Sequence, residues 1–293
     1  MNAAVVLMAY GSPERLEDVP TYYADIRGGR PIRPELLADL TERYRRLGIE
    51  DSNPLNEITE QTRAALEEEL GLPVFTGMKH WHPRIGKAAE RALVTGAETV
   101  VGVVLAPHYS GHSIAGYRHQ LEEAIADRAR LAFVDSWHDD EGLIEFLADR
   151  VRGTDAHVVF TAHSLPARIL DEGDPYEGQL LETSRLVAER AGLRDWSFSY
   201  QSESATGEPW LGPDILDHLE ELHADGVRNV LVCPVGFVAD HLEIRWDLDT
   251  EAREKADELG MELERIEMPN ADPRFIRVLA AIVRRALPVP SSA

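Results

Sequence analysis

The chain has almost no cysteine, since Cys233 is the single thiol among its 293 residues. One thiol cannot form an internal disulfide, and it cannot by itself hold a cysteine-ligated zinc ion or an iron–sulfur cluster. A reducing compartment is the simplest setting for such a chain, so we expect it in the cytoplasm. Cys233 lies within an apolar run, which is typical of a small buried side chain.

Positive charge is also scarce. Lysine occurs only at positions 79, 87 and 255, and 30 Lys and Arg stand against 52 Asp and Glu, which gives a formal net charge of −22. This deficit argues against nucleic acid as a partner, because phosphate backbones are bound by Lys and Arg. It disfavours binding to anionic membrane surfaces for the same reason.

Long apolar runs are missing as well. The longest, ETVVGVVLAP, has the length of a strand and falls far short of the ~20 residues that a membrane helix needs. The opening MNAAVVLMAYG has no basic region and no small-residue cleavage site, so we interpret it as a first strand and not as a signal peptide. We therefore expect no membrane insertion. No segment signals an assembly interface, so a monomer is the default prediction.

Short β-rich runs alternate regularly with longer amphipathic stretches along the chain. Such alternation predicts βαβ units and parallel sheets that are covered on both faces. We predict an α/β fold of two Rossmann-like domains, each a four-stranded parallel sheet flanked by helices. These are an N-terminal domain, 1–150, and a C-terminal domain, 151–270, followed by 271–293, whose amphipathic helix packs back on them. The expected strands are 3–11, 73–80, 99–108, 131–137, 157–164, 196–202, 229–237 and 262–269.

Polar residues gather where these strands end, and ligands of open α/β sheets bind beyond the carboxyl ends of the strands. Five of the 11 histidines stand there, at positions 80, 82, 108, 163 and 241, and the pair Gln201–Ser202 follows another strand. No glycine-rich phosphate loop follows a strand, which disfavours nucleotide binding, and Ser164 lacks the G-x-S-x-G context of a hydrolase. The cleft between the two halves is therefore the predicted site.

A row of acids follows the strand that ends near residue 237. Glu243, Asp247 and Glu251 are spaced four apart, so on an α-helix they share one face, where like charges repel unless a divalent cation lies between them. In a chain with 52 acids, such a row also arises by chance on a solvated face. If His163 faces Glu243, the nitrogen and oxygen donors suit Fe²⁺, and two ligands would hold the metal loosely, as its delivery requires.

Several blocks of the sequence together resemble the ferrochelatases over nearly the whole chain. AHSLP and DHLE are the most specific of them, and GMKHWHP, VLAPHYSGHS and QSESATGEPW add to the match. The resemblance implies a chelatase-like fold and a lyase that inserts Fe²⁺ into a porphyrin in haem biosynthesis. It is nearest to the bacterial coproporphyrin ferrochelatases, because MAYGSP places a tyrosine, Tyr10, where protoporphyrin enzymes have NMGTP.

The resemblance also implies roles for individual residues. His163 and Glu243 match the metal-insertion pair on opposite faces of the macrocycle, and Tyr10 matches the axial ligand of the product iron. Asp247 and Glu251 match an acidic row that leads outward, where Mg²⁺ is a possible occupant although no cofactor is obligatory. The positions that line the porphyrin and its propionates are matched by Arg27, Arg43, Tyr44, Asn53 and Tyr117. Asn53 departs from the family, which often has serine there.

The chemistry leaves alternatives open. A neutral imidazole near pH 7 would accept a pyrrole proton, but the sequence does not divide the metal and proton roles between His163 and Glu243. His241 either orients Glu243 or is a buried structural histidine, and a local polar cluster explains His80 and His82 as well as direct chemistry does. Other functions that remain are a chelatase for protoporphyrin, sirohydrochlorin or another metal, and a haem or metal carrier without catalysis.

Overall fold

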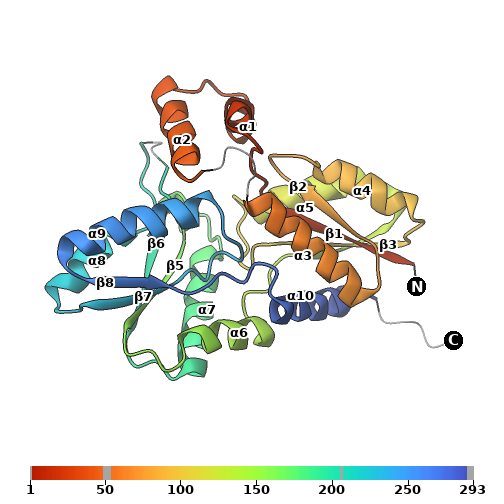
Figure 1. Ribbon diagram of the computed structural model, residues 1–293. Helices are drawn as coiled ribbons and strands as arrows, with labels where there is room; N and C mark the ends of the chain where they lie inside the picture. The colour runs from red at the N-terminus through yellow and green to blue at the C-terminus, as the bar shows by residue number, and fades with distance from the viewer. Residues whose placement is uncertain (1, 49–53, 205–206, 289–293) are drawn as a thin grey trace.

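The computed structural model describes residues 2–48, 54–204 and 207–288, and its core is two four-stranded parallel sheets (Figure 1). The first has the strand order β2-β1-β3-β4 and the second β6-β5-β7-β8. All eight predicted runs contain a strand, so the predicted fold class is confirmed. The strands are β1 (Ala3–Ala9), β2 (Val74–Met78), β3 (Thr99–Val104), β4 (Arg130–Val134), β5 (His157–His163), β6 (Trp196–Gln201), β7 (Asn229–Cys233) and β8 (Glu262–Arg265).

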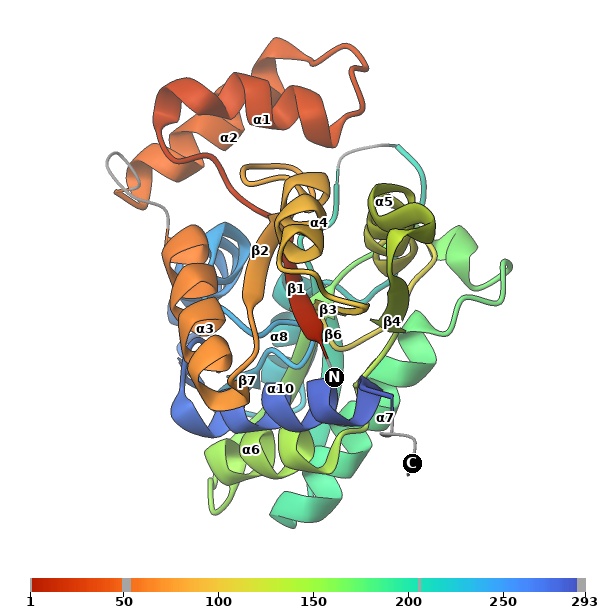
Figure 2. The ribbon, with the colours of Figure 1, turned by 90° about the vertical axis from the view of Figure 1, so that its right-hand side faces the viewer.

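Helices cover both faces of the first sheet, and β1 shows why. Its seven residues are all buried, and they alternate between two layers of the core. Val6 and Met8 pack with α4 and α5, whereas Val5 and Leu7 belong to the larger core that includes Leu66 of α3 and residues of α10. Figure 2 shows α4 and α5 above this sheet and α10 beneath it. A strand buried on both faces is apolar throughout, as the sequence of β1 is.

The remaining elements connect the strands. Short 3₁₀ turns occupy Leu16–Asp18, Ala126–Arg128 and Ala167–Ile169, and a π-helical segment, η4, spans Ile244–Ala252. The α-helices are α1 (Val19–Ile26), α2 (Pro34–Arg46), α3 (Pro54–Leu70), α4 (Ile85–Val94), α5 (Ile114–Ile125), α6 (Glu141–Val151), α7 (Tyr176–Ala191), α8 (Ile215–Ala224), α9 (Arg253–Leu259) and α10 (Pro273–Ala286).

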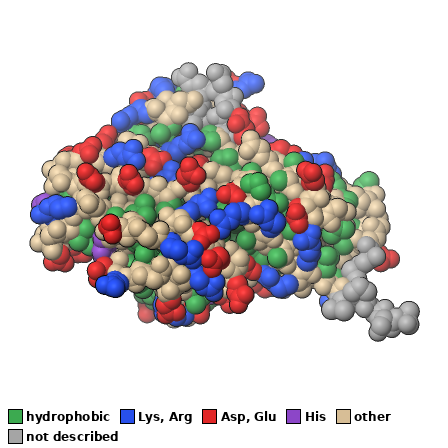
Figure 3. Space-filling view, turned by 60° about the horizontal axis from the view of Figure 1, so that its bottom comes forward, with side chains coloured by type: hydrophobic (Ala, Val, Ile, Leu, Met, Phe, Trp, Pro, Cys, Tyr) green, Lys and Arg blue, Asp and Glu red, His purple; other side chains and the backbone are tan. Residues whose placement is uncertain are grey.

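The C-terminal helix packs back on the body of the protein, as its amphipathic pattern predicts. Asp272 caps α10 by accepting a hydrogen bond from the Arg274 backbone N–H at 2.7 Å, and Pro273 occupies the first turn, where no N–H is needed. The apolar face of α10 packs against α3, α6, β3 and β4. On the face seen in Figure 3, basic and acidic side chains are interspersed, and α10 contributes the ion pairs Arg284–Glu69 and Arg285–Asp140. The domain boundaries at 150 and 270 stay predictions.

The hairpin of α1 and α2 stands over one end of both sheets (Figure 1). On one side, Asp25 of α1 binds Arg84 at the start of α4, with 2.8 Å between Oδ1 and Nη2. On the other side, Tyr44 of α2 packs with Leu242, just before η4. The hairpin therefore touches both halves of the molecule beside their strand ends. Within the described residues, no helix combines the length and the apolar character needed to cross a bilayer.

Candidate active site

His163 is the last residue of β5 and pairs with Gln201 at the end of β6. Its Nδ1 contacts the backbone carbonyl of Ser164, so Nδ1 carries a proton. The other ring nitrogen, Nε2, faces Glu243. Ser164 is itself held, because its hydroxyl donates to the Leu211 carbonyl at 2.7 Å. The Tyr176 hydroxyl donates to the backbone carbonyl of His163 at 3.0 Å. The imidazole is therefore oriented before any ligand arrives.

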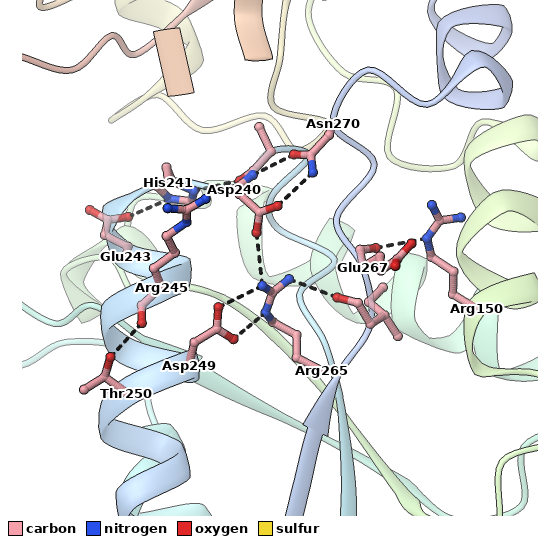
Figure 4. Close-up of polar contacts among 12 residues, drawn as sticks. Arg150, Asp240, His241, Glu243, Arg245, Asp249, Thr250, Arg265, Glu267 and Asn270 are labelled. Atoms are coloured by element: carbon pink, nitrogen blue, oxygen red, sulfur yellow. Dashed lines mark hydrogen bonds and ion pairs between the residues drawn. The ribbon is translucent and has the colours of Figure 1, made fainter. Parts of the chain in front are cut away.

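Glu243 stands at the start of η4 and lies between two histidines. Its Oε1 is 3.5 Å from His163 Nε2, and its Oε2 is 3.4 Å from His241 Nε2. The His241 Nδ1–H donates to the Ala239 carbonyl at 2.8 Å, so this ring is fixed from the loop that precedes η4 (Figure 4). His241 thus meets both interpretations that the sequence left open: it is hydrogen-bonded structurally, and it orients Glu243.

Protonation of this pair follows from its geometry. Desolvation would lower the pKa of His163, but the Glu243 carboxylate and the Ser164 carbonyl raise it to about 9. Desolvation would raise the pKa of Glu243, but the imidazoles of His163 and His241 hold it well below its usual range. The geometry therefore favours an imidazolium–carboxylate pair, whereas the sequence predicted a neutral His163 near pH 7.

The pair does not enclose the macrocycle. A flat ring requires about 3.5 Å to the nearest atoms on each side, hence about 7 Å between groups on opposite faces. His163 and Glu243 approach to 3.5 Å. The prediction that His163 and Glu243 act from opposite faces of the macrocycle is therefore wrong. Both come from the strand ends of one sheet, and they lie too close together for the ring to fit between them. Both side chains still reach solvent, with 30% and 37% of their surface exposed.

Tyr10 follows β1 and is 42% exposed, which is unusual for so large an apolar side chain. Its ring leans on the His80 ring, with centroids 4.5 Å apart. The next residue must be glycine: Gly11 has φ +84°, and a Cβ there would lie 2.7 Å from Trp81 Cβ. Desolvation and then the charge of Glu243 raise the pKa of Tyr10 above its usual value, which places the phenol within electrostatic range of that carboxylate.

The acidic row is confirmed as a cluster but not as an α-helical face. Residues 244–252 form a π-helix, whose hydrogen bonds run from residue i to i+5. Arg43 of α2 reaches two members of the row, with Nη1 3.8 Å from Asp247 Oδ1 and Nη2 3.9 Å from Glu251 Oε1. Asp247 also binds the Ser202 hydroxyl. Burial and the charge of Glu243 raise the pKa of Asp247 to about 7.

These donors do not fit a resident Mg²⁺ as they stand. Mg²⁺ prefers six oxygen ligands in octahedral geometry. Here a guanidinium lies within 4 Å of both carboxylates and occupies the position of a cation. The part of the chain that the structure describes holds no group of three or more His, Cys, Asp or Glu side chains that could bind a metal ion.

Other predicted residues have partners of their own. Arg27 ends α1, with its guanidinium 6.0 Å above the Tyr23 ring, and its buried Nε has no hydrogen-bond partner among the described residues. Tyr44 is buried, and its hydroxyl is 2.9 Å from Ser12 Oγ. Tyr117 is buried on α5, with Lys79 Nζ 4.8 Å from its ring centroid. Asn53 lies outside the described residues.

Two further strand-end histidines have structural partners. His80 Nδ1 is 2.8 Å from Asp25 Oδ2, and the same carboxylate binds Arg84, so His80 belongs to a local polar cluster. His108 is buried, with Nε2 2.9 Å from Thr183 Oγ1, and burial lowers its pKa to about 3. A histidine that stays neutral across the physiological range is not a proton carrier there.

Sequence reasoning missed several residues that support the pair. Gln201 is fully buried, accepts a hydrogen bond from Thr161 at 3.0 Å, and donates to the Glu243 carbonyl at 3.4 Å. Ser202 has φ +65° and binds Asp247. Gln201 ends β6 and Ser202 follows it, so the sequence signal was their place at a strand end, although the sequence assigns them no role. Tyr176 lies on α7, where no sequence signal marks its contact with His163.

The chain matches known proteins over nearly its full length. The family model described as Ferrochelatase matches residues 2–287. A ferrochelatase of Herpetosiphon aurantiacus is 43% identical over 301 residues, which cover 96% of this chain and 98% of that protein. A coproporphyrin III ferrochelatase of Halalkalibacterium halodurans is 41% identical over 302 residues, which cover 97% of this chain and 96% of that one.

Solved structures support the fold. The structure of SirB from Bacillus subtilis with Fe³⁺ aligns with a TM-score of 0.63 and covers 98% of this chain and 96% of that one. The identity is 13%, so this similarity concerns the arrangement of the sheets and helices alone. The chelatase-like fold implied by the sequence is confirmed.

Proposed function

The chain belongs to the ferrochelatase family, and from that premise we propose that it inserts Fe²⁺ into coproporphyrin III as a step of haem biosynthesis. The observation that carries the proposal is the approach of His163 Nε2 to Glu243 Oε1, which are 3.5 Å apart. His163 ends β5, and Glu243 lies in the connection that follows the neighbouring strand β7. Relatives about 40% identical carry the name coproporphyrin III ferrochelatase. The exposed Tyr10 beside the pair supports the same choice.

The pair would act on one face of the ring. The reaction releases two pyrrole N–H protons and takes up one Fe²⁺, so the site needs a metal ligand and an exit for protons. Fe²⁺ binds neutral imidazole and carboxylate, so His163 must release its proton as the metal arrives. Glu243 keeps its charge and supplies the oxygen donor. His241 holds Glu243 in place through its Nε2, which is 3.4 Å from Oε2 of the carboxylate.

The rim of the substrate needs positive charge in this acidic chain. Propionates are bound well by the planar fork of arginine. Arg27 supports this role, because its buried Nε has no hydrogen-bond partner among the residues described. Lys79 contributes a further cation near Tyr117. Coproporphyrin carries more propionates than protoporphyrin, so such cations would favour it.

Tyr10 is proposed as the ligand to iron in the product. Its side chain is 42% exposed, and its phenol, whose pKa is raised by burial and then by the charge of Glu243, lies within electrostatic range of that carboxylate. A raised pKa keeps the phenol protonated while the site is free of metal. The Fe-porphyrin would lower that pKa and favour a phenolate–iron contact.

The test is anaerobic addition of Fe²⁺ to protein with coproporphyrin III, and separately with protoporphyrin IX. Insertion converts the free-base absorption spectrum to that of the metalated ring, faster for coproporphyrin. A carrier would bind haem and leave the free-base spectrum unchanged. His163→Ala should abolish conversion while porphyrin still quenches the protein fluorescence. Conversion that survives this substitution would remove His163 from the mechanism.

A further inference from the structure

Arg265, the last residue of β8, joins two carboxylates that flank Glu243 in the chain. Its Nε and Nη2 each donate to Asp249, at 2.9 Å, in a bidentate pair. Nη2 also donates to Asp240 Oδ1 at 3.0 Å. Figure 4 shows the guanidinium between the loop that carries Asp240 and His241 and the helix that carries Asp249.

The guanidinium is itself fixed. Its Nη1 donates to the Ile266 carbonyl at 2.9 Å, and the side chain is only 13% exposed. Since β8 pairs in register with β7, up to Val232 opposite Arg265, the arginine projects from the sheet and not from a mobile loop. A donor anchored in this way sets the positions of the groups that bind it.

Asn270 completes the hold on the loop. Its amide donates to Asp240 Oδ2 at 2.7 Å and accepts from the Asp240 backbone N–H at 2.8 Å. Its own backbone N–H donates to the Val238 carbonyl at 2.8 Å, and its φ is +47°. Both oxygens of Asp240 are therefore bonded to residues of one short segment, 265–270.

Glu243 lies between these tethers, three residues after Asp240 and six before Asp249. Its carboxylate must stay within reach of His163, although Asp247 lies within electrostatic range of it. Without Arg265, the two carboxylates that flank Glu243 in the chain would lose the guanidinium that both bind. The unpaired carboxylates would then repel each other, and no Arg265 hydrogen bond would keep the loop and the start of η4 from moving apart.

We propose that Arg265 is a positioning residue for metal insertion, which ties Asp240 and Asp249 together so that Glu243 is held against His163. The proposal rests on the proposed function and adds a residue that touches neither metal nor porphyrin. Partners of this kind change metal affinity or activity by roughly 10–100-fold when removed.

The test uses Arg265→Met, which keeps the length of the side chain and removes its donors. We expect kcat/KM for Fe²⁺ and for Zn²⁺ to fall roughly 10–100-fold, while KM for coproporphyrin stays the same, because the porphyrin contacts lie elsewhere. Backbone amides of residues 240–249 should exchange hydrogen faster. Arg265→Lys should remain impaired, because an ammonium cannot serve two carboxylates in fixed geometry.

Arg150→Met is the matched control. Arg150 is 16% exposed and bonds the Glu267 carbonyl at 2.9 Å and Asp272 at 3.2 Å, next to the Arg265 network but without contact to Asp240 or Asp249 (Figure 4). It should lower the melting temperature and leave kcat/KM for metal intact. If Arg265→Met fails to fold, Asn270→Gly removes the other tether without backbone strain and should reproduce the selective loss for metal.

Any one of three results overturns the role of Arg265. These are an unchanged kcat/KM for metal in Arg265→Met, a wild-type kcat/KM for metal in Arg265→Lys, or an equal loss of kcat/KM for metal in the Arg150→Met control. An active wild type with any of these results refutes only that role. A wild type that metalates no porphyrin refutes the proposed function instead.

Discussion

Metal insertion should depend steeply on pH, because Fe²⁺ and a proton compete for the same nitrogen. The pKa of His163 is raised from 6.5 to about 9 by Glu243, against the effect of desolvation. A metal ligand must be deprotonated, so metal uptake is weakened at every pH below that value. The wild-type kcat/KM for metal is expected to rise with pH through the neutral range and to level off near pH 9.

The size of the effect follows from the same pKa. At pH 7 a group with a pKa of about 9 has lost its proton in about one molecule in 100, so kcat/KM for metal should be about 100-fold below its plateau. The two side chains are 30% and 37% exposed, so screening by water makes this an upper value. The free energy of unfolding has the opposite trend: because the folded pKa of His163 is raised, the stabilisation that this group contributes is complete below about pH 6.5 and is lost as pH rises through about 9.

Initial rates of Zn²⁺ insertion, followed by porphyrin fluorescence from pH 6 to 9 at limiting metal, test this directly. Zn²⁺ avoids oxidation of Fe²⁺ at high pH. Glu243→Gln removes the charge that holds the proton, so its profile should be flat above about pH 6.5, at a lower absolute rate. His112→Gln removes an imidazole paired with Glu172 at 2.6 Å elsewhere and should leave the slope unchanged. A flat wild-type profile, or a slope that Glu243→Gln retains, would refute the reasoning.

Three further changes test other parts of the site. Gly11→Ala should lower the free energy of unfolding by about 2–5 kcal/mol, from left-handed strain of about 1–2 and a clash at Trp81 of about 1–3; Gly28→Ala, at φ +59° in open space, adds strain alone, and equal losses in denaturant titrations would contradict this. Arg27→Met should raise KM for coproporphyrin up to about tenfold and leave KM for metal unchanged; steady-state kinetics with each substrate varied would show the reverse if Arg27 acted on metal. Arg43→Met should tighten Mg²⁺ binding in calorimetry, because Asp247 and Glu251 lose the cation between them; unchanged binding would refute that competition.

The sequence predicted those features that depend on local pattern. Apolar runs such as 3–11 and 157–164 become strands because continuous β-branched and apolar residues suit a sheet buried on both faces. The rule that ligands bind at the carboxyl ends of strands then predicted His163 as a site residue. The spacing of Glu243, Asp247 and Glu251 indicated a shared face, and Arg43 does meet the last two.

Other features depend on contacts between distant residues. Spacing by four is compatible with an α-helix and with the observed π-helix, so the sequence could not choose between them. The same-side approach of His163 to Glu243 depends on how the loop after β7 folds back. In that loop, Asp240 is bound by Arg265, 25 residues later in the sequence, and by Asn270, 30 residues later. No local sequence pattern predicts either bond.

The pairing of the acids explains how the proposed metal site would pass a cation on without keeping it. Glu243 is shared by two imidazoles, and Arg43 lies against Asp247 and Glu251. An entering metal must therefore displace a proton or a guanidinium at each step instead of meeting free carboxylates. Each displacement would reduce the net gain from binding, so the proposed site would hold the metal weakly along the row. A site that traps iron would need its acids unpaired, whereas one that passes iron to a porphyrin needs them occupied until the metal arrives.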